Sequence, residues 1–392
     1  MRFRHSDGTV VHLGYGSNVH PAETVDGIVH QLEVYAAGVR ARLGADRLGV
    51  GLWLPVEAAR VLATDPGEVA RVRTTLDRHG LEIVTVNAFP YQGFHDPVVK
   101  HAVYRPDWSS RARLDFTLDC ARALAQLLPE DAARGSISTL PFGWRAPWYA
   151  DRAALALEHL SLLSEGLAKL QTDTGRTVRV GIEPEPGCVV ETIAEAVERM
   201  AGLDPEHIGL CLDTCHLATG FEDGATALET LSGNGIPVVK TQVSAALHAE
   251  DPMDESTREA LARYTEDRFL HQVRQPVGPK VAGRDDLPEA LAAGGLSGKA
   301  PWRVHFHVPV HADPQPPLVS TRSHLVDTMT ALLGGPAAGT DHLEVETYTW
   351  GVLPAERRPR DDQGLIDGIA AEVRWTADLL EQLGLEPIGG GR

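Results

Sequence analysis

The chain alternates short apolar runs with longer stretches in which apolar residues recur at helical spacing. After the first run, for example, Val25, Ile28 and Leu32 lie on one face of a predicted helix. Each run is short enough to be a buried strand, and each is followed by such a helical pattern. The alternation predicts an α/β fold whose parallel sheet closes on itself, a (β/α)8 barrel. The first seven predicted strands are residues 10–15, 48–54, 83–89, 136–142, 178–183, 208–213 and 237–244.

The alternation breaks after Ser244. Residues 245–341 are predicted to form an insertion or extension after the seventh strand, within one barrel domain that covers residues 1–392. An additional apolar run at residues 302–310 makes nine candidate strands, although a barrel needs eight. We predict that residues 342–347 are the eighth barrel strand and that the additional run belongs to the insertion.

Several residues mark where helices are expected to begin and end. Asp65 followed by Pro66 is a typical pair of cap and first-turn residues. Asp151 is predicted to cap a long helix that extends to about residue 171. A last helix is predicted at residues 365–383, and the tail at residues 386–392 is expected to be flexible.

Acidic and imidazole side chains stand at the ends of two consecutive predicted strands. Glu183 and Glu185 end the fifth, and Asp213 and His216 follow the sixth. In a barrel, the carboxyl ends of the strands meet at the face where active sites lie. Side chains two residues apart share a strand face, which groups further polar residues as Lys240 with Gln242 and Ser244, His305 with His307, and Glu344 with Glu346.

A ring of carboxylates at one end of a barrel would repel itself unless a positive charge lay at its centre. A divalent ion meets this need: carboxylates with an amide oxygen suit Mg²⁺, Mn²⁺ or Co²⁺, whereas an imidazole would favour Zn²⁺. Each residue also has a structural interpretation. Glu183 could be a solvated strand end, Asp213 a helix cap, Gln242 a polar strand end, and Glu346 the outside of an edge strand. We favour the metal because all four structural interpretations would have to hold together.

Composition narrows the function further. The net charge of −18 disfavours nucleic-acid binding, which depends on Lys and Arg neutralising phosphates. Four scattered cysteines indicate no disulfide framework, so a reducing cytoplasm is the expected location. The N-terminal residues have no apolar core for export, and no apolar stretch is long enough for a membrane span.

The motifs IEPEPG, LDTCH, KTQVS and LEVET resemble the xylose-isomerase-like TIM barrel superfamily. This superfamily takes in sugar isomerases and epimerases, hydroxypyruvate isomerase and the endonuclease IV type of apurinic-site nuclease. Nearly the whole chain, including YGSNVHP, VNAFPYQGFH, VYRPDW, RVHFHVPV and HLEVETYTW, is similar to the EboE-type metabolite traffic proteins of bacterial secondary-metabolite gene clusters.

The superfamily resemblance implies one divalent metal ion held by Glu183, Asp213, Gln242 and Glu346. A Gln at the third position is similar to hydroxypyruvate isomerase, whereas ketose epimerases and endonuclease IV have His there. Endonuclease IV also has further histidines on its third and fourth strands, where this chain has Asn87 and Thr139.

The implied activity is that of an isomerase or epimerase acting on a small polyhydroxylated, sugar-like or cyclitol-like metabolite through an enediolate. Glu183 and Glu346 would move the proton, and Mn²⁺, Mg²⁺ or Co²⁺ would be the ion, with Zn²⁺ as an alternative. Expected substrate-binding residues at strand ends and rim loops are His216, Glu185, His305, His307, Asn87, Tyr91, Trp53 and His20.

Three questions stay open at this point. The pair His305 and His307 could hold a second metal, contact substrate or pack at the edge of the insertion. The chain could be an accessory metabolite-binding protein that keeps the metal site, or an apurinic-site phosphodiesterase. We expect a small polyol as the partner, with neither nucleic acid nor membrane, and a homodimer as one alternative for the oligomeric state.

Overall fold

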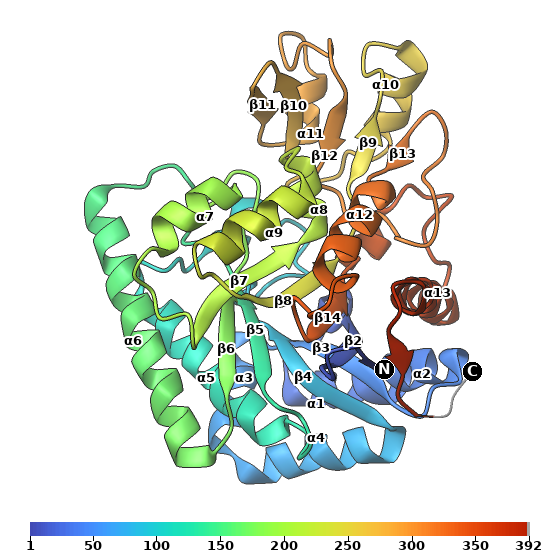
Figure 1. Cartoon of the computed structure of the whole chain (residues 1–392). Coiled ribbons are helices and arrows are strands. Elements are labelled where there is room, and N and C mark those ends of the chain that lie inside the picture. Colours follow the sequence, from blue (N-terminus) through green and yellow to red (C-terminus); the bar gives the residue numbers. More distant parts are fainter. Residues whose placement is uncertain (390–392) are drawn as a thin grey trace.

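The computed structural model describes residues 1–389, and in it eight parallel strands close into a barrel (Figure 1). The strands follow one another around the barrel in chain order, and β14 pairs with both β8 and β2 to close it. The predicted (β/α)8 barrel is therefore confirmed, with residues 342–345 in the eighth strand. The barrel strands are β2 (Val10–Gly16), β3 (Leu48–Trp53), β4 (Leu81–Asn87), β5 (Gly135–Thr139), β6 (Val178–Ile182), β7 (Ile208–Asp213), β8 (Val238–Val243) and β14 (His342–Val345).

A buried ion pair lies inside the barrel. Lys240 Nζ donates to Glu344 Oε2 at 2.7 Å, and neither side chain is exposed. Glycines on the neighbouring strands make room for this pair, because a Cβ at Gly51 would lie 2.0 Å from Glu344 Oε2 and one at Gly16 would lie 2.8 Å from Oε1. The glycines in the apolar runs of β2 and β3 therefore have a packing role.

Helices surround the barrel, and most begin where the sequence indicates. Asp65 caps the helix that starts at Pro66, as expected. The long helix predicted at Asp151 begins one residue earlier, with Tyr149 at the cap position, because the Asp151 side chain bonds only the next residue's N–H. The α-helices are α1 (Val25–Gln31), α2 (Ala37–Leu43), α3 (Val56–Thr64), α4 (Pro66–His79), α5 (Arg111–Leu127), α6 (Ala150–Thr174), α7 (Ile193–Met200), α8 (Thr214–Thr219), α9 (Gly224–Gly233), α10 (Glu255–Ala262), α11 (Leu287–Leu291), α12 (Arg322–Leu333) and α13 (Asp362–Gln382). A π-helical turn (Leu32–Ala36) joins α1 to α2, and 3-10 turns lie at Ser17–Val19, Lys100–Tyr104 and Tyr348–Val352.

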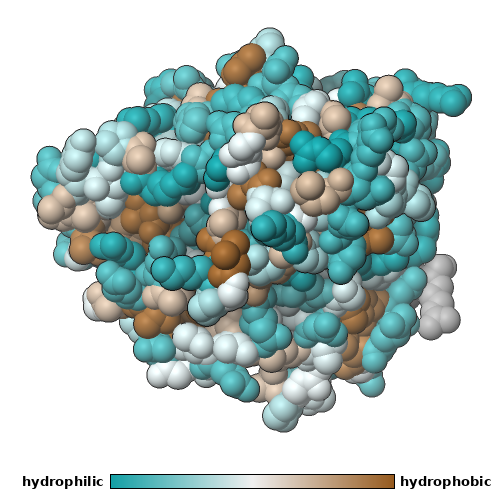
Figure 2. Space-filling view, turned by 90° about the horizontal axis from the view of Figure 1, so that it is seen from above, coloured by the Kyte–Doolittle hydropathy of each residue, from teal (hydrophilic) through white to brown (hydrophobic). Residues whose placement is uncertain are grey.

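Between β8 and β14 the chain forms a second, antiparallel sheet with the order β11-β10-β12-β9-β13. Figure 1 shows this sheet at the upper end of the barrel, with α10 and α11. Seen from above, this face is mainly hydrophilic, and its apolar residues lie in separate spots (Figure 2). The strands are β9 (Leu247–Ala249), β10 (Val273–Val277), β11 (Lys280–Arg284), β12 (Trp302–Val304) and β13 (Val319–Ser320).

The predicted strand at residues 302–310 is shorter than expected. Only Trp302–Val304 pairs with neighbours, as β12. Beyond it, His305 N–H still donates to Gln272, but Phe306 N–H turns back to Val304 and Val308 N–H donates to Ala245 beside β8. This irregular path carries residues 305–308 away from the second sheet and toward the barrel.

The two ends of the described chain meet beside β2. β1 (Arg2–Arg4) pairs with both β2 and β15 (Glu386–Pro387). The tail predicted to be flexible from residue 386 therefore begins as a short strand, because β1 offers it a free edge; residues 390–392 lie outside the described residues. Within residues 1–389, no helix combines the length and apolar composition that crossing a membrane would require.

Candidate metal centre

Three carboxylates converge at the carboxyl end of the barrel. Asp213 is the last residue of β7, and Glu183 and Glu346 directly follow β6 and β14. One oxygen of each lies within 4.8 Å of the others. The three residues are only 3%, 2% and 4% exposed, for Glu183, Asp213 and Glu346 in turn. Each was expected at this place from the end of its apolar run.

Asp213 is both a helix cap and a candidate ligand. Its Oδ1 accepts the N–H groups of Cys215 at 2.7 Å and His216 at 2.9 Å, which begins α8, and the Ser244 hydroxyl at 2.8 Å. Its Oδ2 is buried and has no hydrogen-bond partner. The cap fixes the side chain and leaves one oxygen without a hydrogen-bond partner, so the two interpretations of this residue are compatible.

The other two expected ligands also carry free acceptor atoms. Glu183 Oε2 is buried without a partner, and so are both side-chain polar atoms of Gln242. Gln242 pairs in register with Asp213 on the adjacent strand, so their side chains are on the same face of the sheet. Glu346 Oε1 accepts from Asn18 at 2.7 Å and Asn87 at 3.0 Å. Asn87, expected to bind substrate, thus orients a carboxylate.

The three carboxyl groups of this centre have shifted pKa values. Burial, with added repulsion from Asp213, raises the pKa of Glu183 to about 8 even though His216 opposes the shift. Burial and the charges of Glu183 and Asp213 raise the pKa of Glu346 well above its usual range. The pKa of Asp213 is lowered, because His216 and His307 outweigh the effect of burial. Three carboxylates in one buried place disfavour their shared ionised state.

A divalent cation would relieve this strain, and the residues fit one. Buried acceptors without partners are costly, and Glu183 and Asp213, which each carry one, have a carboxylate oxygen within 4.8 Å of each other and of Glu346. Carboxylate oxygens from Glu183, Asp213 and Glu346, with the amide oxygen of Gln242, form a donor set suited to Mg²⁺, Mn²⁺ or Co²⁺. Zn²⁺ becomes an alternative because His307 Nε2 lies 3.9 Å from Asp213 Oδ2.

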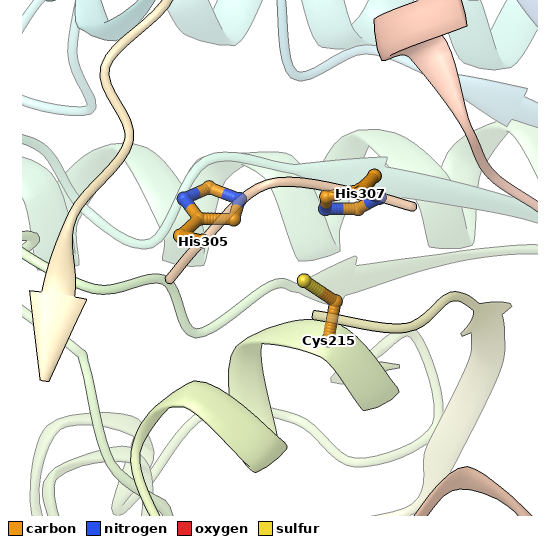
Figure 3. A group of neighbouring side chains, drawn as sticks. All are labelled: Cys215, His305 and His307. Carbon is orange, nitrogen blue, oxygen red and sulfur yellow. The ribbon is translucent and has the colours of Figure 1, made fainter. Parts of the chain in front are cut away.

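Three imidazoles stand beside the carboxylates. His216 comes from α8, whereas His305 and His307 come from the segment that follows β12. His216 Nε2 lies 3.0 Å from His305 Nε2 and 3.8 Å from Asp213 Oδ2. In Figure 3 the Cys215 sulfur points toward the rings of His305 and His307. The two histidines of the insertion therefore belong to the barrel's site and not to the edge of the second sheet.

A cavity of about 50 Å³ adjoins the carboxylates and imidazoles. Three rings from separate segments line it, and we call them the aromatic cover: Phe94, Phe269 and Tyr348. Their centroids lie 5.0 to 5.4 Å apart. A space of this size holds a few water molecules at about 10–15 Å³ each, so a sugar-sized substrate requires the cover to move.

Lys100 fastens the aromatic cover. Its Nζ donates to the Phe269 carbonyl at 2.7 Å, the Glu266 carbonyl at 3.1 Å and Asp286 at 2.6 Å. The backbone N–H groups of Val99 and Lys100 also donate to Arg268. These bonds join the long loop after β4 to the insertion, two segments distant in sequence. No sequence pattern predicts this contact, because it joins a short 3-10 turn to an irregular segment 169 residues further along the chain.

Glu185 lies at the side of the cavity and is held by hydrogen bonds. Tyr104 donates its hydroxyl to Glu185 Oε1 at 2.6 Å, and Gln272 Nε2 donates to the Tyr104 oxygen at 3.0 Å. Burial raises the pKa of Glu185 to about 7. Sequence reasoning placed Glu185 near the site. It assigned no role to Tyr104, although this residue lies in the motif VYRPDW, and it missed Gln272, which lies in none of the motifs.

Three residues expected to bind substrate do not line this cavity. His20 stacks on Tyr35 and contacts Tyr15, and it is 1% exposed. The Trp53 indole donates to the Pro90 carbonyl at 3.0 Å, so its polar group is already satisfied. Tyr91 packs edge-on against Phe116. The structure gives these three residues packing contacts, and their predicted contact with substrate stays a prediction. His216, Glu185, His305, His307 and Asn87 do line the cavity.

The fold and the site together define a (β/α)8 protein with a buried carboxylate and imidazole centre at the mouth of the barrel. Residues 40–271, more than half of the chain, match the family described as xylose isomerase-like TIM barrel, and the chain belongs to this family. No curated protein sequence is similar enough to count as a match.

Solved structures with the same fold have low sequence identity. An IOLI protein with a bound zinc atom is 12% identical with a TM-score of 0.51, covering 95% of this chain and 98% of that one. An L-ribulose 3-epimerase is 14% identical with a TM-score of 0.50, covering 95% and 96%. A D-allulose 3-epimerase from Methylomonas sp. is 12% identical with a TM-score of 0.50, covering 97% and 100%. Such distant likeness shows the fold alone.

Proposed function

We propose that this protein is a divalent-metal-dependent isomerase or epimerase of a small polyhydroxylated metabolite, sugar-like or cyclitol-like. One observation carries the proposal: buried oxygens of Glu183 and Asp213 without partners lie beside Glu346 at the mouth of the barrel. The family and the epimerases that share its fold support the same reaction class. A place in a secondary-metabolite pathway rests only on the resemblance to EboE-type proteins.

The residues divide the work as follows. Glu183, Asp213, Gln242 and Glu346 would hold the ion, which when bound polarises a substrate carbonyl and the hydroxyl beside it. Glu183 and Glu346 would remove a proton from one carbon and return it to the same or the next, giving an enediolate in between. The aromatic cover would exclude water while the carbanion exists.

The test is enolisation itself. The metal-loaded protein is incubated in D2O with a panel of ketoses, aldoses and cyclic polyols, and deuterium at carbon is measured by mass spectrometry and NMR. We expect incorporation into at least one compound, and a loss of at least about a hundredfold in Glu183→Gln and in Glu346→Gln. Glu222→Gln is the matched control, because Glu222 is a half-buried acid outside the cavity. Full activity in Glu183→Gln would refute the assignment.

A second candidate is an accessory metabolite-binding protein of the EboE type. The small volume of the cavity, about 50 Å³, favours it, because a carrier needs a fitted binding space and not turnover. Tight binding of a cyclic polyol without deuterium incorporation would support this candidate over the enzyme. An apurinic-site nuclease is less well supported, since the net charge is −18 and Asn87 is bonded to Glu346 where that enzyme has a histidine.

A further inference from the structure

We propose that Glu372, on the outer helix α13, is a positioning residue that holds Glu346 and His307 in place at the mouth of the barrel. Glu372 does not line the cavity. Its carboxylate joins two segments that meet there, the loop after β14 and the part of the insertion that carries His307. The effect on metal binding rests on the proposed function, whereas the hydrogen-bond part of the inference does not.

The Glu372 carboxylate accepts three hydrogen bonds from these two segments. The Thr347 hydroxyl donates to Oε1 at 2.6 Å, and the Val310 N–H donates to the same oxygen at 3.1 Å. The Trp350 indole donates to Oε2 at 3.0 Å. All three donors are neutral groups, and Glu372 is 1% exposed. Because a buried carboxylate is costly without its hydrogen bonds, the two segments are held to α13 by the groups that satisfy it.

The face of α13 that carries Glu372 has room for the loop after β14. Gly368 lies one turn before Glu372, so the two residues share a face of the helix. A Cβ at Gly368 would lie 2.6 Å from the Trp350 ring. Glycine therefore admits the indole, whose N–H reaches Glu372. Figure 1 shows α13 on the outer side of the barrel, where it packs against β14 and β2.

Two of the three bonds fix the loop that follows β14. Thr347 directly follows Glu346, one of the converging carboxylates. Tyr348, a ring of the aromatic cover, lies between Thr347 and Trp350 at the start of a 3-10 turn. On the other side, the Glu346 N–H donates to the Val243 carbonyl at 3.1 Å. The backbone around this carboxylate is therefore held by the barrel on one side and by α13 on the other.

The third bond ties the insertion to the same place. Val310 lies three residues beyond His307, which is itself bonded to the loop after β14. The His307 Nδ1 donates to the Glu346 carbonyl at 2.8 Å, since a carbonyl only accepts, and the His307 carbonyl accepts the Thr349 hydroxyl. A shift of Val310 away from α13 would disturb both contacts. Glu372 thus connects the insertion with an expected metal ligand through one side chain.

The first measurement uses the metal-free protein and follows the imidazole N–H of His307. Because this proton is bonded to the Glu346 carbonyl, its exchange with solvent reports how firmly the two segments are held. We expect exchange at least about tenfold faster in Glu372→Gln, measured by NMR on protein with isotope-labelled histidine. The Nδ1–H of His216, bonded to the Pro184 carbonyl, is the internal reference and should not change. Equal exchange of the His307 proton in both proteins would overturn the proposal.

The second measurement is the affinity for Mn²⁺, determined by calorimetric titration. Substituting a residue that orients a metal ligand commonly lowers metal affinity about 10- to 100-fold, and we expect a loss in this range in Glu372→Gln. Glu222→Gln is the matched control. Glu222 is a half-buried acid that accepts a backbone N–H, from Ile193 at 3.0 Å, but its carboxylate bonds neither the loop after β14 nor the insertion. A loss below about twofold in Glu372→Gln, or an equal loss in the control, would contradict the positioning role.

A double variant separates positioning from a general loss of stability. In Glu372→Gln the amide oxygen can keep some of the donors, but the amide nitrogen, itself a donor, then faces another donor. Trp350→Phe removes the indole N–H and with it this conflict. We expect Glu372→Gln/Trp350→Phe to bind Mn²⁺ at least about threefold more tightly than Glu372→Gln, although the smaller ring should lower the thermal unfolding temperature. If the double variant bound Mn²⁺ no more tightly, Glu372 would have a structural role alone.

Thr347→Val keeps the proposal testable if Glu372→Gln does not fold. This change removes one of the three bonds and keeps a branched side chain of similar size. We expect the His307 imidazole proton to exchange faster in this variant too, by a smaller factor, and an unchanged rate would count against the proposal. A wild type that binds no divalent ion would instead refute the proposed function, and the exchange measurements would still decide whether Glu372 holds the two segments.

Discussion

Buried acidic side chains are paired with cationic groups at the amino end of the barrel, whereas several of those described at the carboxyl end are unpaired. At the amino end, Glu82 in β4 accepts from Arg2 at 2.6 and 2.9 Å and lies 3.1 Å from His12 Nδ1. These bonds hold the pKa of Glu82 well below its usual range although burial opposes them. Nearby, Asp341 is paired with Arg134 at 2.7 Å. The charges at this end already have partners within the chain.

At the carboxyl end, some carboxylate oxygens lack a hydrogen-bond partner within the described residues. Glu183 and Glu346 have raised pKa values, and acceptor oxygens of Glu183 and Asp213 have no partner. Both ends are buried, so burial alone does not separate them. The difference is that one end supplies its own cations, whereas the other gathers donors around a place that only an external cation would complete. Paired charges at one end indicate stability, and unpaired charges at the other indicate binding.

The largest expected effect is a difference in folding stability between Glu82→Gln and Glu183→Gln. Glu82→Gln removes the charge that pairs with Arg2 and should lower the free energy of unfolding by about 3 kcal/mol. Glu183→Gln in the metal-free protein should lower it by less than about 1 kcal/mol, because the raised pKa keeps Glu183 protonated at neutral pH and its replacement removes no paired charge. Urea unfolding without metal measures both; equal losses would contradict the comparison.

The next effect is stabilisation by the ion. With a divalent cation at about a hundred times its dissociation constant, the free energy of unfolding should rise by about 2.7 kcal/mol over the chelated protein. Glu346→Gln should lose most of this gain because it removes one of the converging carboxylates. Thermal unfolding with and without chelator measures the gain. Glu82→Gln serves as the control, and it should show the same gain from a lower starting stability.

The sequence was sufficient to predict the barrel and its charged mouth. Apolar runs that end at Glu183 and Asp213 identify strand ends, and parallel strands place such ends together. The (β/α) alternation also separated the eighth strand from the run at residues 302–310. These features are local in the chain and repeat, so the pattern of polar and apolar residues contains them.

The sequence could not predict which polar side chains are already satisfied. His20 and His307 look equivalent in the sequence, yet one stacks on Tyr35 and the other presents a free Nε2. The contact of Lys100 with the insertion joins segments about 170 residues apart, through irregular backbone. Whether an imidazole is a ligand depends on what stands behind its Nδ1, and that is decided by tertiary structure.

The smallest expected effect is a dependence of metal affinity on pH, which distinguishes the carboxyl end of the barrel from the amino end. Without metal, Glu183 has a pKa of about 8, so it is protonated at neutral pH and must release its proton before it can bind a cation. The apparent affinity for the ion should therefore rise with pH by about tenfold, or 1.4 kcal/mol, per unit below 8, and this contribution should level off above 8. Glu346, with its raised pKa, would steepen the rise.

Glu82 supplies the contrast. Its lowered pKa keeps it ionised from pH 5 upward, so its contribution to stability is constant there and is lost only as pH falls through the lowered value. Calorimetric titration with Mn²⁺ between pH 6 and 9 measures the slope. The slope should flatten in Glu183→Gln, whose amide carries no ionisable proton, and stay unchanged in Glu222→Gln. If the affinity of the wild type for Mn²⁺ did not depend on pH, the acids at the carboxyl end would already be ionised, like Glu82 at the amino end, and the comparison would be wrong.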